Sequence, residues 1–92
     1  MKYIILKTKI CGIEKKVPII FPNEFVHAFV AKAAQKLIIQ HWNVGSEVVS
    51  AGDADILNVV CSGESTTLKV ASEGDADSQV IEMYNYTHGI DI

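Results

Sequence analysis

The first part of the chain carries two runs of mainly apolar residues with a strand-like pattern. Residues 3–10 (YIILKTKI) are rich in β-branched side chains and end at Cys11-Gly12, where the glycine can adopt a positive φ. Residues 15–21 (KKVPIIF) form a second run of the same kind. Pro18 cannot donate a ladder hydrogen bond, so this second strand either lies at the edge of a sheet or has that position facing outward. The pattern predicts a β-hairpin.

A helical period replaces the strand pattern after Pro22. Residues 25–41 contain no Gly or Pro, and at 100° per residue most of their apolar side chains fall on one arc. That arc holds Val26, Val30, Ala33, Ala34, Leu37 and His41, and Phe25 and Phe29 extend it on one side. Asn23 is suited to cap this helix, and Glu24 to favour the positive end of its dipole. We therefore expect an amphipathic helix that covers a sheet.

Three further β-like runs and a second helix complete the pattern. The runs are residues 47–51, 56–61 and 66–71, and the last two are joined by Ser62-Gly63-Glu64-Ser65, a length typical of hairpin loops. Residues 72–75 (SEGD) resemble a capping box, and apolar residues recur at helical spacing up to about Tyr86. The predicted order is ββαβββα. It indicates a single small α+β domain over residues 1–92, with an antiparallel or mixed sheet and two helices packed mainly on one face.

Composition adds a tendency to self-associate. Of the 92 residues, 49% are apolar, which is more than a core of this size easily encloses. In the run 56–61, apolar residues occupy both alternating sets, so both sides of that strand carry apolar groups. We expect a homo-oligomer, a dimer in the simplest case, that buries a sheet face left open by the helices.

Charge is divided between the two halves of the chain. Residues 1–43 carry seven lysines against two glutamates, a net charge of +5, whereas residues 44–92 carry one lysine against nine acidic residues, a net charge of −8. Either the halves neutralise each other within one molecule, or a basic face meets an acidic face of a partner. The chain has no arginine, which removes bidentate contacts to guanine and phosphate, so we expect no nucleic-acid partner.

Membrane and export signals are not recognisable. The longest apolar stretch, residues 17–21, has five residues against the roughly 20 that a membrane-spanning helix needs, so we expect no membrane partner. Lys7 and Lys9 interrupt the first apolar run, which argues against a signal peptide. Cys11 and Cys61 are far apart and form no CxxC motif, which argues against a zinc ribbon or a disulfide scaffold. The expected location is the cytoplasm.

The tetrapeptide GDAD occurs twice, at residues 52–55 and 74–77. Calcium loops bring together more oxygen ligands than the two carboxylates of each copy. The first copy lies between two predicted strands, where Gly and Asp are ordinary turn residues. In the second copy, Asp75 lies in the first turn of the last helix, where its charge favours the helix dipole and its side chain can help to cap. We therefore expect no metal and no other cofactor.

Candidate chemistry is confined to His27 and residues 61–65. His27 lies at the border of the apolar arc and can be either a half-buried, hydrogen-bonded histidine or a base. Cys61 and Ser62 border a glycine-containing loop, but its sequence SGES is not the G-x-S-x-G motif of a nucleophile elbow. The loop is either a polar connection or a small anion-holding site. The candidate binding residues are His27, Ser62, Gly63, Glu64 and Ser65, and no catalytic residue is assigned.

Four short segments carry a resemblance to a known family. They are residues 17–22 (VPIIFP), residues 49–52 (VSAG), residues 62–65 (SGES) followed by Leu68, and an acidic helix start after Ser72. Together they resemble a family of small proteins encoded by tailed phages and prophages, although similar proteins have Pro where this chain has Gly74. The resemblance implies a phage or prophage product acting inside a bacterial host cell, with no established activity and no catalytic residues to carry over.

The residues leave three hypotheses about function open. The first is a non-enzymatic, self-associating module that binds a host or phage protein. The second is a small hydrolase or transferase built on residues 61–65, in which His27 activates Ser62 or Cys61. The third is an inhibitor of a host protein that uses the acidic second half of the chain to mimic a polyanion.

Overall fold

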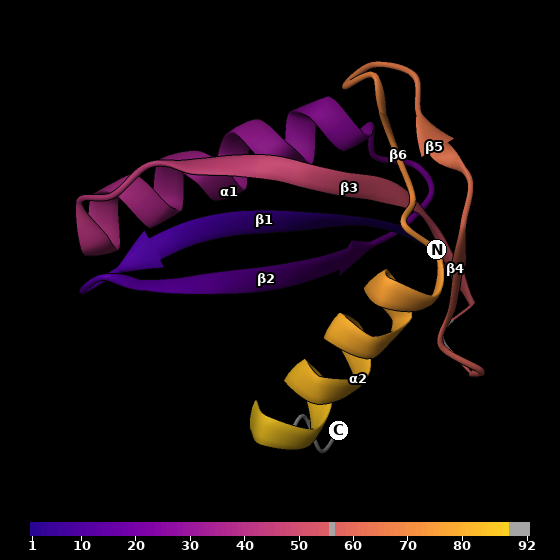
Figure 1. Ribbon diagram of the computed structural model, residues 1–92. Coiled ribbons are helices and arrows are strands. Elements are labelled where there is room, and N and C mark those ends of the chain that lie inside the picture. Colours follow the sequence, from indigo (N-terminus) through magenta and orange to yellow (C-terminus); the bar gives the residue numbers. More distant parts are fainter. Residues whose placement is uncertain (56, 89–92) are drawn as a thin grey trace.

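A four-stranded antiparallel sheet with one helix on each face forms the protein in a computed structural model that describes residues 1–55 and 57–88 (Figure 1). The elements are β1 (Lys2–Ile10), β2 (Ile13–Phe21), α1 (His27–Trp42), β3 (Ser46–Asp55), β4 (Val60–Ser62), β5 (Glu64–Ser65), β6 (Val70–Ala71) and α2 (Asp75–His88). The sheet has the order β2-β1-β3-β4, and β5 and β6 form a separate two-stranded ribbon. The predicted α+β class is confirmed.

The predicted hairpin of β1 and β2 is present, and the two strands pair along their whole length. Cys11 (φ 52°) and Gly12 (φ 80°) both adopt a positive φ in the two-residue turn, as tight β-hairpins require. β2 lies at the edge of the sheet, where the missing N–H of Pro18 is tolerated. Of the two alternatives that Pro18 leaves open, the edge position is therefore correct.

The first GDAD segment lies inside β3, so the prediction of a turn at residues 52–55 was wrong. Gly52 is a residue of β3. This position requires glycine because a Cβ there would collide with the carbonyl oxygen of Ser62. A glycine lets the chain after β4 approach the β3 backbone closely. Asp53 and Asp55 then pair with Ser62 and Val60 of β4. The glycine thus marks a close backbone approach, which its sequence context does not distinguish from a turn.

The strands predicted at residues 56–61 and 66–71 are much shorter than expected, and side chains that bind the local backbone explain why. Asp55 accepts hydrogen bonds from the Leu57 N–H (3.0 Å) and the Asn58 side chain (3.1 Å), which favours a turn before β4. Residue 56 lies outside the described residues. Ser65 Oγ accepts the Leu68 N–H (3.2 Å), which favours a second turn between β5 and β6.

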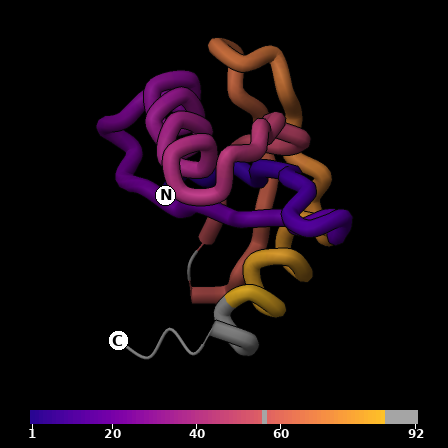
Figure 2. The backbone as a smooth tube through the Cα atoms, turned by 90° about the vertical axis from the view of Figure 1, so that its left-hand side faces the viewer, coloured from indigo at the N-terminus to yellow at the C-terminus, as the bar shows by residue number. Residues whose placement is uncertain are grey.

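The two helices cover opposite faces of the sheet, not mainly one face as predicted (Figure 1, Figure 2). α1 buries Ala31 and Ile38 in one core cluster, and α2 buries Ile81 in the other. The central strand β1 supplies both clusters: Ile4 and Leu6 face α1, and Tyr3 and Ile5 face α2. Four consecutive buried residues are typical of a strand covered on both sides. The predicted oligomer contact through an open sheet face therefore loses its basis, because α2 occupies that face.

α1 begins at His27, later than the cap predicted at Asn23. Val26 occupies the N-cap position, and no side chain caps the helix. Residues 22–25 form a turn in which the Phe25 N–H donates to the Pro22 carbonyl (3.2 Å). The helix ends at Asn43, which has a left-handed φ of 55° and donates its N–H to the Ile39 carbonyl (2.9 Å). The predicted Asn23 cap was wrong because the proline directs the chain into this turn first.

Candidate interaction surface

His27, the first candidate residue, is buried at the start of α1. Its Nε2 lies 2.9 Å from the carbonyl oxygen of Gly52, and its ring meets Phe21 edge-on, with centroids 5.5 Å apart. The imidazole therefore fastens the first turn of α1 to β3. Of the two roles considered from the sequence, a hydrogen-bonded histidine or a base, the contact with Gly52 corresponds to the first.

The four candidate loop residues do not converge on one site. Ser62 and Glu64 are exposed, whereas Ser65 is buried and its Oγ lies 3.2 Å from Thr67 Oγ1 within its own ribbon. Gly63 has a φ of 82°, and its carbonyl accepts the Ser72 N–H (2.9 Å). Within the described part of the chain, no hydrogen bond links His27 to any of the four. Ser62 ends β4, Gly63 connects it to β5, and Glu64 and Ser65 form β5, so the prediction of a hairpin loop at residues 62–65 was wrong.

Cys61, the other possible nucleophile, is buried against α2 in the cluster that contains Tyr3 and Ile81. Burial raises the pKa of the Cys61 thiol, and the nearby negative charge of Asp77 adds to the shift. A neutral, buried thiol is a poor nucleophile. His27 packs against Phe21, which belongs to the core cluster on the α1 side. His27 and Cys61, one of the two nucleophiles considered for the hydrolase hypothesis, thus lie on different faces of the sheet.

A buried hydrogen-bond network at the start of α2 was not predicted. The Asp77 carboxylate accepts hydrogen bonds from the Tyr3 hydroxyl, from Ser50 Oγ (2.8 Å) and from the Glu73 N–H (2.9 Å). The Tyr3 hydroxyl is also 2.6 Å from Ser72 Oγ. Tyr3 is 0% exposed and Asp77 2%. Burial, followed by the hydrogen bond to Asp77, raises the pKa of Tyr3 far above its ordinary value. The network joins α2 to β1 and β3.

The cap predicted for α2, in which the Asp75 side chain helps to cap the helix, was wrong. Asp75 is exposed, and Asp77 is the residue whose carboxylate binds a backbone N–H at the helix start. Ser72 Oγ accepts the Gly74 N–H (3.0 Å), not that of Asp75. A signal for this arrangement was present, because Asp77 lies three and four residues before Val80 and Ile81 and so shares their inward face.

Metal binding finds no geometric basis in residues 1–55 and 57–88. Nowhere in these residues do three or more His, Cys, Asp or Glu side chains group as a metal ion would require. The two GDAD segments also differ in role: Asp53 and Asp55 are exposed in β3, whereas Asp77 is buried and fully engaged in α2.

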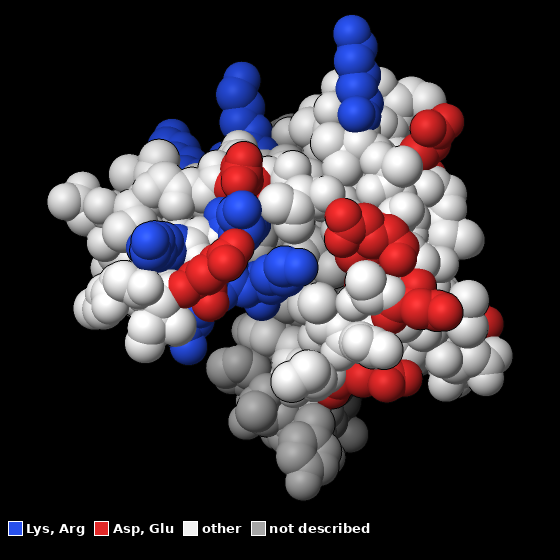
Figure 3. All heavy atoms as spheres, in the orientation of Figure 1, with Lys and Arg blue, Asp and Glu red and all other residues white. Residues whose placement is uncertain are grey.

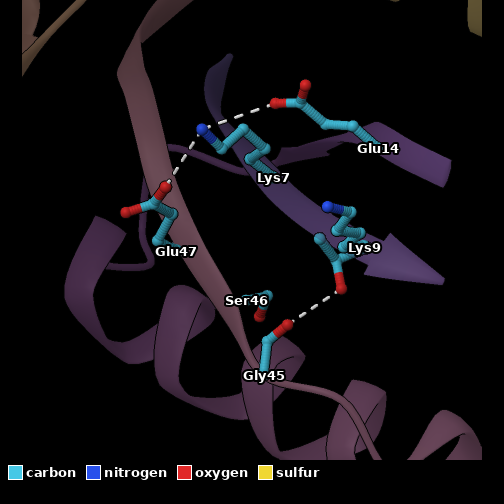
Figure 4. A pocket seen from close by; sticks show the side chains of 7 residues that line it. Lys7, Lys9, Glu14, Gly45, Ser46 and Glu47 are labelled. Atoms are coloured by element: carbon cyan, nitrogen blue, oxygen red, sulfur yellow. Dashed lines mark hydrogen bonds and ion pairs between the residues drawn. The ribbon is translucent and has the colours of Figure 1, made fainter. Parts of the chain in front are cut away.

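A polar pocket of about 470 Å³ lies between the β1–β2 hairpin and the start of β3 (Figure 4). Lys7 Nζ lies between two carboxylates, 3.3 Å from Glu47 Oε1 and 3.4 Å from Glu14 Oε1. Glu47 and then Glu14 raise the pKa of Lys7. Because Lys7 and Lys9 face two glutamates, the charges of the lining balance. Such a pocket has little selectivity for an anion or a cation.

A second groove, of about 640 Å³, lies along the edge strand β2 between α1 and α2. Ile38 and Trp42 of α1 line one side, and Val80 of α2 lines the other. Lys15, Lys16 and Pro18 occupy the exposed edge. Lysine and proline on an edge strand discourage pairing with another strand, so the groove is a weaker candidate for a binding site than the outer side of α1.

The outer side of α1 carries an unusual number of exposed apolar side chains. We call them, together with two residues just before the helix, the α1 outer surface: Phe25, Val26, Phe29, Leu37 and Ile39, each 47–63% exposed. Phe25 and Phe29 stack with centroids 6.3 Å apart and an interplanar angle of 11°. The inner side of the same helix buries His27, Ala31 and Ile38. A helix that is apolar on both sides is typical of one covered on both sides.

Charged side chains are also separated in space. Figure 3 shows most lysines over β1, β2 and α1, with some acidic side chains among them, and most other acidic side chains over β4, β5, β6 and the start of α2. The charge asymmetry of the sequence therefore survives folding in part, as a mainly basic and a mainly acidic end. The ion pair of Lys7 with Glu47 joins the two halves of the chain, so they neutralise each other only in part within one molecule.

The described residues include no helix long and apolar enough to cross a membrane. Comparison with known proteins gives no relative for the chain: no family model, no curated protein and no solved structure matches it.

Proposed function

We propose that this chain is a non-enzymatic protein-binding module that associates with itself, and that the α1 outer surface is its contact surface. The observation that carries the proposal is the stacked pair Phe25–Phe29 on a helix whose opposite side already forms the core. Five large apolar side chains, each about half exposed, amount to roughly 500 Å² of apolar surface, interrupted by Lys32 and Lys36. Exposed apolar groups that are interspersed with polar residues in this way often mark a binding site.

The proposed setting is the cytoplasm of a bacterial host, where the protein would act as a phage or prophage product that binds a host or phage protein as well as itself. The support is the resemblance of residues 17–22, 49–52 and 62–65 to the phage family. The hydrolase or transferase hypothesis gains no support from the geometry, because His27 and Cys61 face different sides of the sheet and no hydrogen bond among the described residues links His27 to Ser62.

A second candidate function is inhibition of a host protein by the acidic end. The clustering of acidic side chains over β4 to β6 and the start of α2 favours it (Figure 3). Binding of this kind weakens strongly with added salt, whereas contacts made by the α1 outer surface depend mainly on apolar burial. The salt dependence of any captured partner therefore separates the two functions.

The proposal is tested by the oligomeric state of a surface variant. We expect the wild-type protein to exceed the monomer mass in light scattering at tens of micromolar, and Phe29→Ser to shift it towards the monomer. Ile13→Ser is the matched control, because Ile13 is 61% exposed on the hairpin against 63% for Phe29. Equal masses for all three proteins would argue against the α1 outer surface as the contact.

A further inference from the structure

The charges around the α1 outer surface restrict what can cover it. Lys32 and Lys36 are exposed and lie within about 60° of Phe29 around the helix. The sixteen residues of α1 include no Asp or Glu. Two α1 helices packed face to face would therefore place lysines against lysines, and like charges across an interface cost binding energy. The surface calls for a partner that is both apolar and acidic.

A second surface of the same molecule has this chemistry. Asp53 and Asp55 are exposed on β3, and Glu64 is exposed on the nearby β5. Val60, which pairs with Asp55, is 56% exposed, and Leu57 in the preceding turn is 93% exposed. We call these five residues the β4 acidic surface. It lies at the sheet edge opposite β2, because the strand order is β2-β1-β3-β4.

The two surfaces are exposed in the same molecule and so do not cover each other. The β4 acidic surface lies on the acidic side of Figure 3, whereas α1 belongs to the lysine-rich side. Each side chain that defines the two surfaces remains exposed. Contact between these surfaces therefore requires two molecules.

We propose that the occupant of the α1 outer surface is the β4 acidic surface of a second copy of this chain. The lysines of one copy, Lys32 and Lys36, then face the acidic residues of the second copy, Asp53, Asp55 and Glu64. Phe25 and Phe29 of the first copy contact Val60 and Leu57 of the second. This inference rests on the proposed function and names its partner. The exposed apolar area, roughly 500 Å², is below the ~800 Å² per partner of a standard interface. The association is therefore of modest affinity and falls as ionic strength rises.

Charge reversal on each surface tests the pairing. One variant carries Lys32→Glu and Lys36→Glu, and the other carries Asp53→Lys and Glu64→Lys, chosen because no side-chain hydrogen bond of Asp53 or Glu64 is needed for a turn. Sedimentation velocity at tens of micromolar and low salt measures association. We expect each variant alone to associate at least roughly tenfold more weakly than the wild type.

An equimolar mixture of the two variants provides the decisive measurement. Glutamates on α1 of one variant then face lysines on β3 and β5 of the other, while the two unaltered surfaces remain complementary. We expect the mixture to recover association close to the wild-type level. Lys15→Glu with Lys16→Glu is the control for net charge, because it changes two exposed lysines of β2 outside both surfaces. Circular dichroism and urea unfolding establish that every variant is folded.

The outcomes separate the inference from the proposed function. Association that is unchanged in both reversal variants, or lost in both and not recovered in the mixture, overturns the inference. If Phe29→Ser still dissociates the protein in that case, the α1 outer surface stands as a contact for a different part of the partner. A monomeric wild-type protein under these conditions overturns the inference and removes self-association from the proposed function.

Discussion

The two helices of this protein are held to the same sheet by different means. α2 is joined to β1 and β3 by the buried network of Asp77, Tyr3 and Ser50, in addition to the apolar contact of Ile81. α1 is held by apolar packing of Ala31 and Ile38, with His27 as its buried polar contact. The outer side of α1 is nevertheless apolar, with Phe29 63% exposed.

The difference shows which helix is available for a partner. Buried polar groups tolerate little displacement, because each lost hydrogen bond leaves an unsatisfied group in the core. α2 thus has a fixed position. α1 has apolar groups on both sides, and only one side is used by the fold. The exposed apolar side chains of the α1 outer surface are part of the 49% apolar content that the core does not enclose.

Of all the changes considered, Asp77→Ala is expected to lower the free energy of unfolding most. The substitution leaves Ser50 and the Glu73 N–H without their acceptor and removes one of the two partners of the Tyr3 hydroxyl, and buried groups left unsatisfied cost about 1–3 kcal/mol each. We expect the free energy of unfolding to fall by about 3 kcal/mol or more in urea titrations. Asp75→Ala, on the exposed side of the same turn, is the control. Similar losses in both variants would show that the network does not hold α2.

The next largest effect is expected within α1. Ile38 is buried against the sheet, whereas its neighbour Ile39 is 52% exposed. Ile38→Ala should lower the free energy of unfolding by about 2–4 kcal/mol, since it leaves a cavity in the core. Ile39→Ala should change it by less than about 1 kcal/mol and weaken self-association instead. The expectation fails if stability responds equally to the two changes.

Tyr3→Phe should have a smaller effect that depends on pH. The folded protein keeps Tyr3 protonated, because its pKa is raised, while the unfolded chain ionises near the ordinary value of 10.0. The resulting stability is complete below pH 10 and is lost as pH rises above it. Urea midpoints should therefore fall above pH 10 in the wild type and less steeply in Tyr3→Phe. At pH 7 the variant should lose about 1–2 kcal/mol. Parallel pH profiles would contradict this assignment.

The smallest effect is expected in thiol labelling. Cys11 is exposed in the hairpin turn, and Cys61 is buried with a raised pKa. Iodoacetamide at pH 8 should label Cys11 first, while Cys61 reacts only as fast as α2 opens. Mass spectrometry of peptic fragments follows both sites. In Asp77→Ala the Cys61 rate should rise and the Cys11 rate should stay the same. Rapid labelling of Cys61 in the wild type would show that α2 is loosely held.

Local patterns in the sequence were sufficient for the hairpin, the two helices and the α+β class. Gly12 and the edge proline Pro18 each report on neighbouring residues only, and the structure agrees with them. Apolar periodicity identified α1 but not its inward side: Val26, Leu37 and His41 of the predicted arc are exposed, and the helix instead buries His27, Ala31 and Ile38. The structure places the candidate binding residues His27 and Ser65 in hydrogen bonds that stabilise the fold. Periodicity also placed Phe25 and Phe29 on the margin of the apolar arc, where the structure exposes them.

The sequence by itself determined the first hairpin, the two helices, the surplus of apolar residues and the separation of charge along the chain. Only the tertiary structure decided that the helices take opposite faces, that Gly52 is a close-approach residue and that Tyr3 meets Asp77 across 74 positions. The physical reason is that strand order and helix placement depend on which distant apolar surfaces pack together. A periodic pattern shows that a helix has an apolar side, but not which sheet face it covers or how much of it remains exposed.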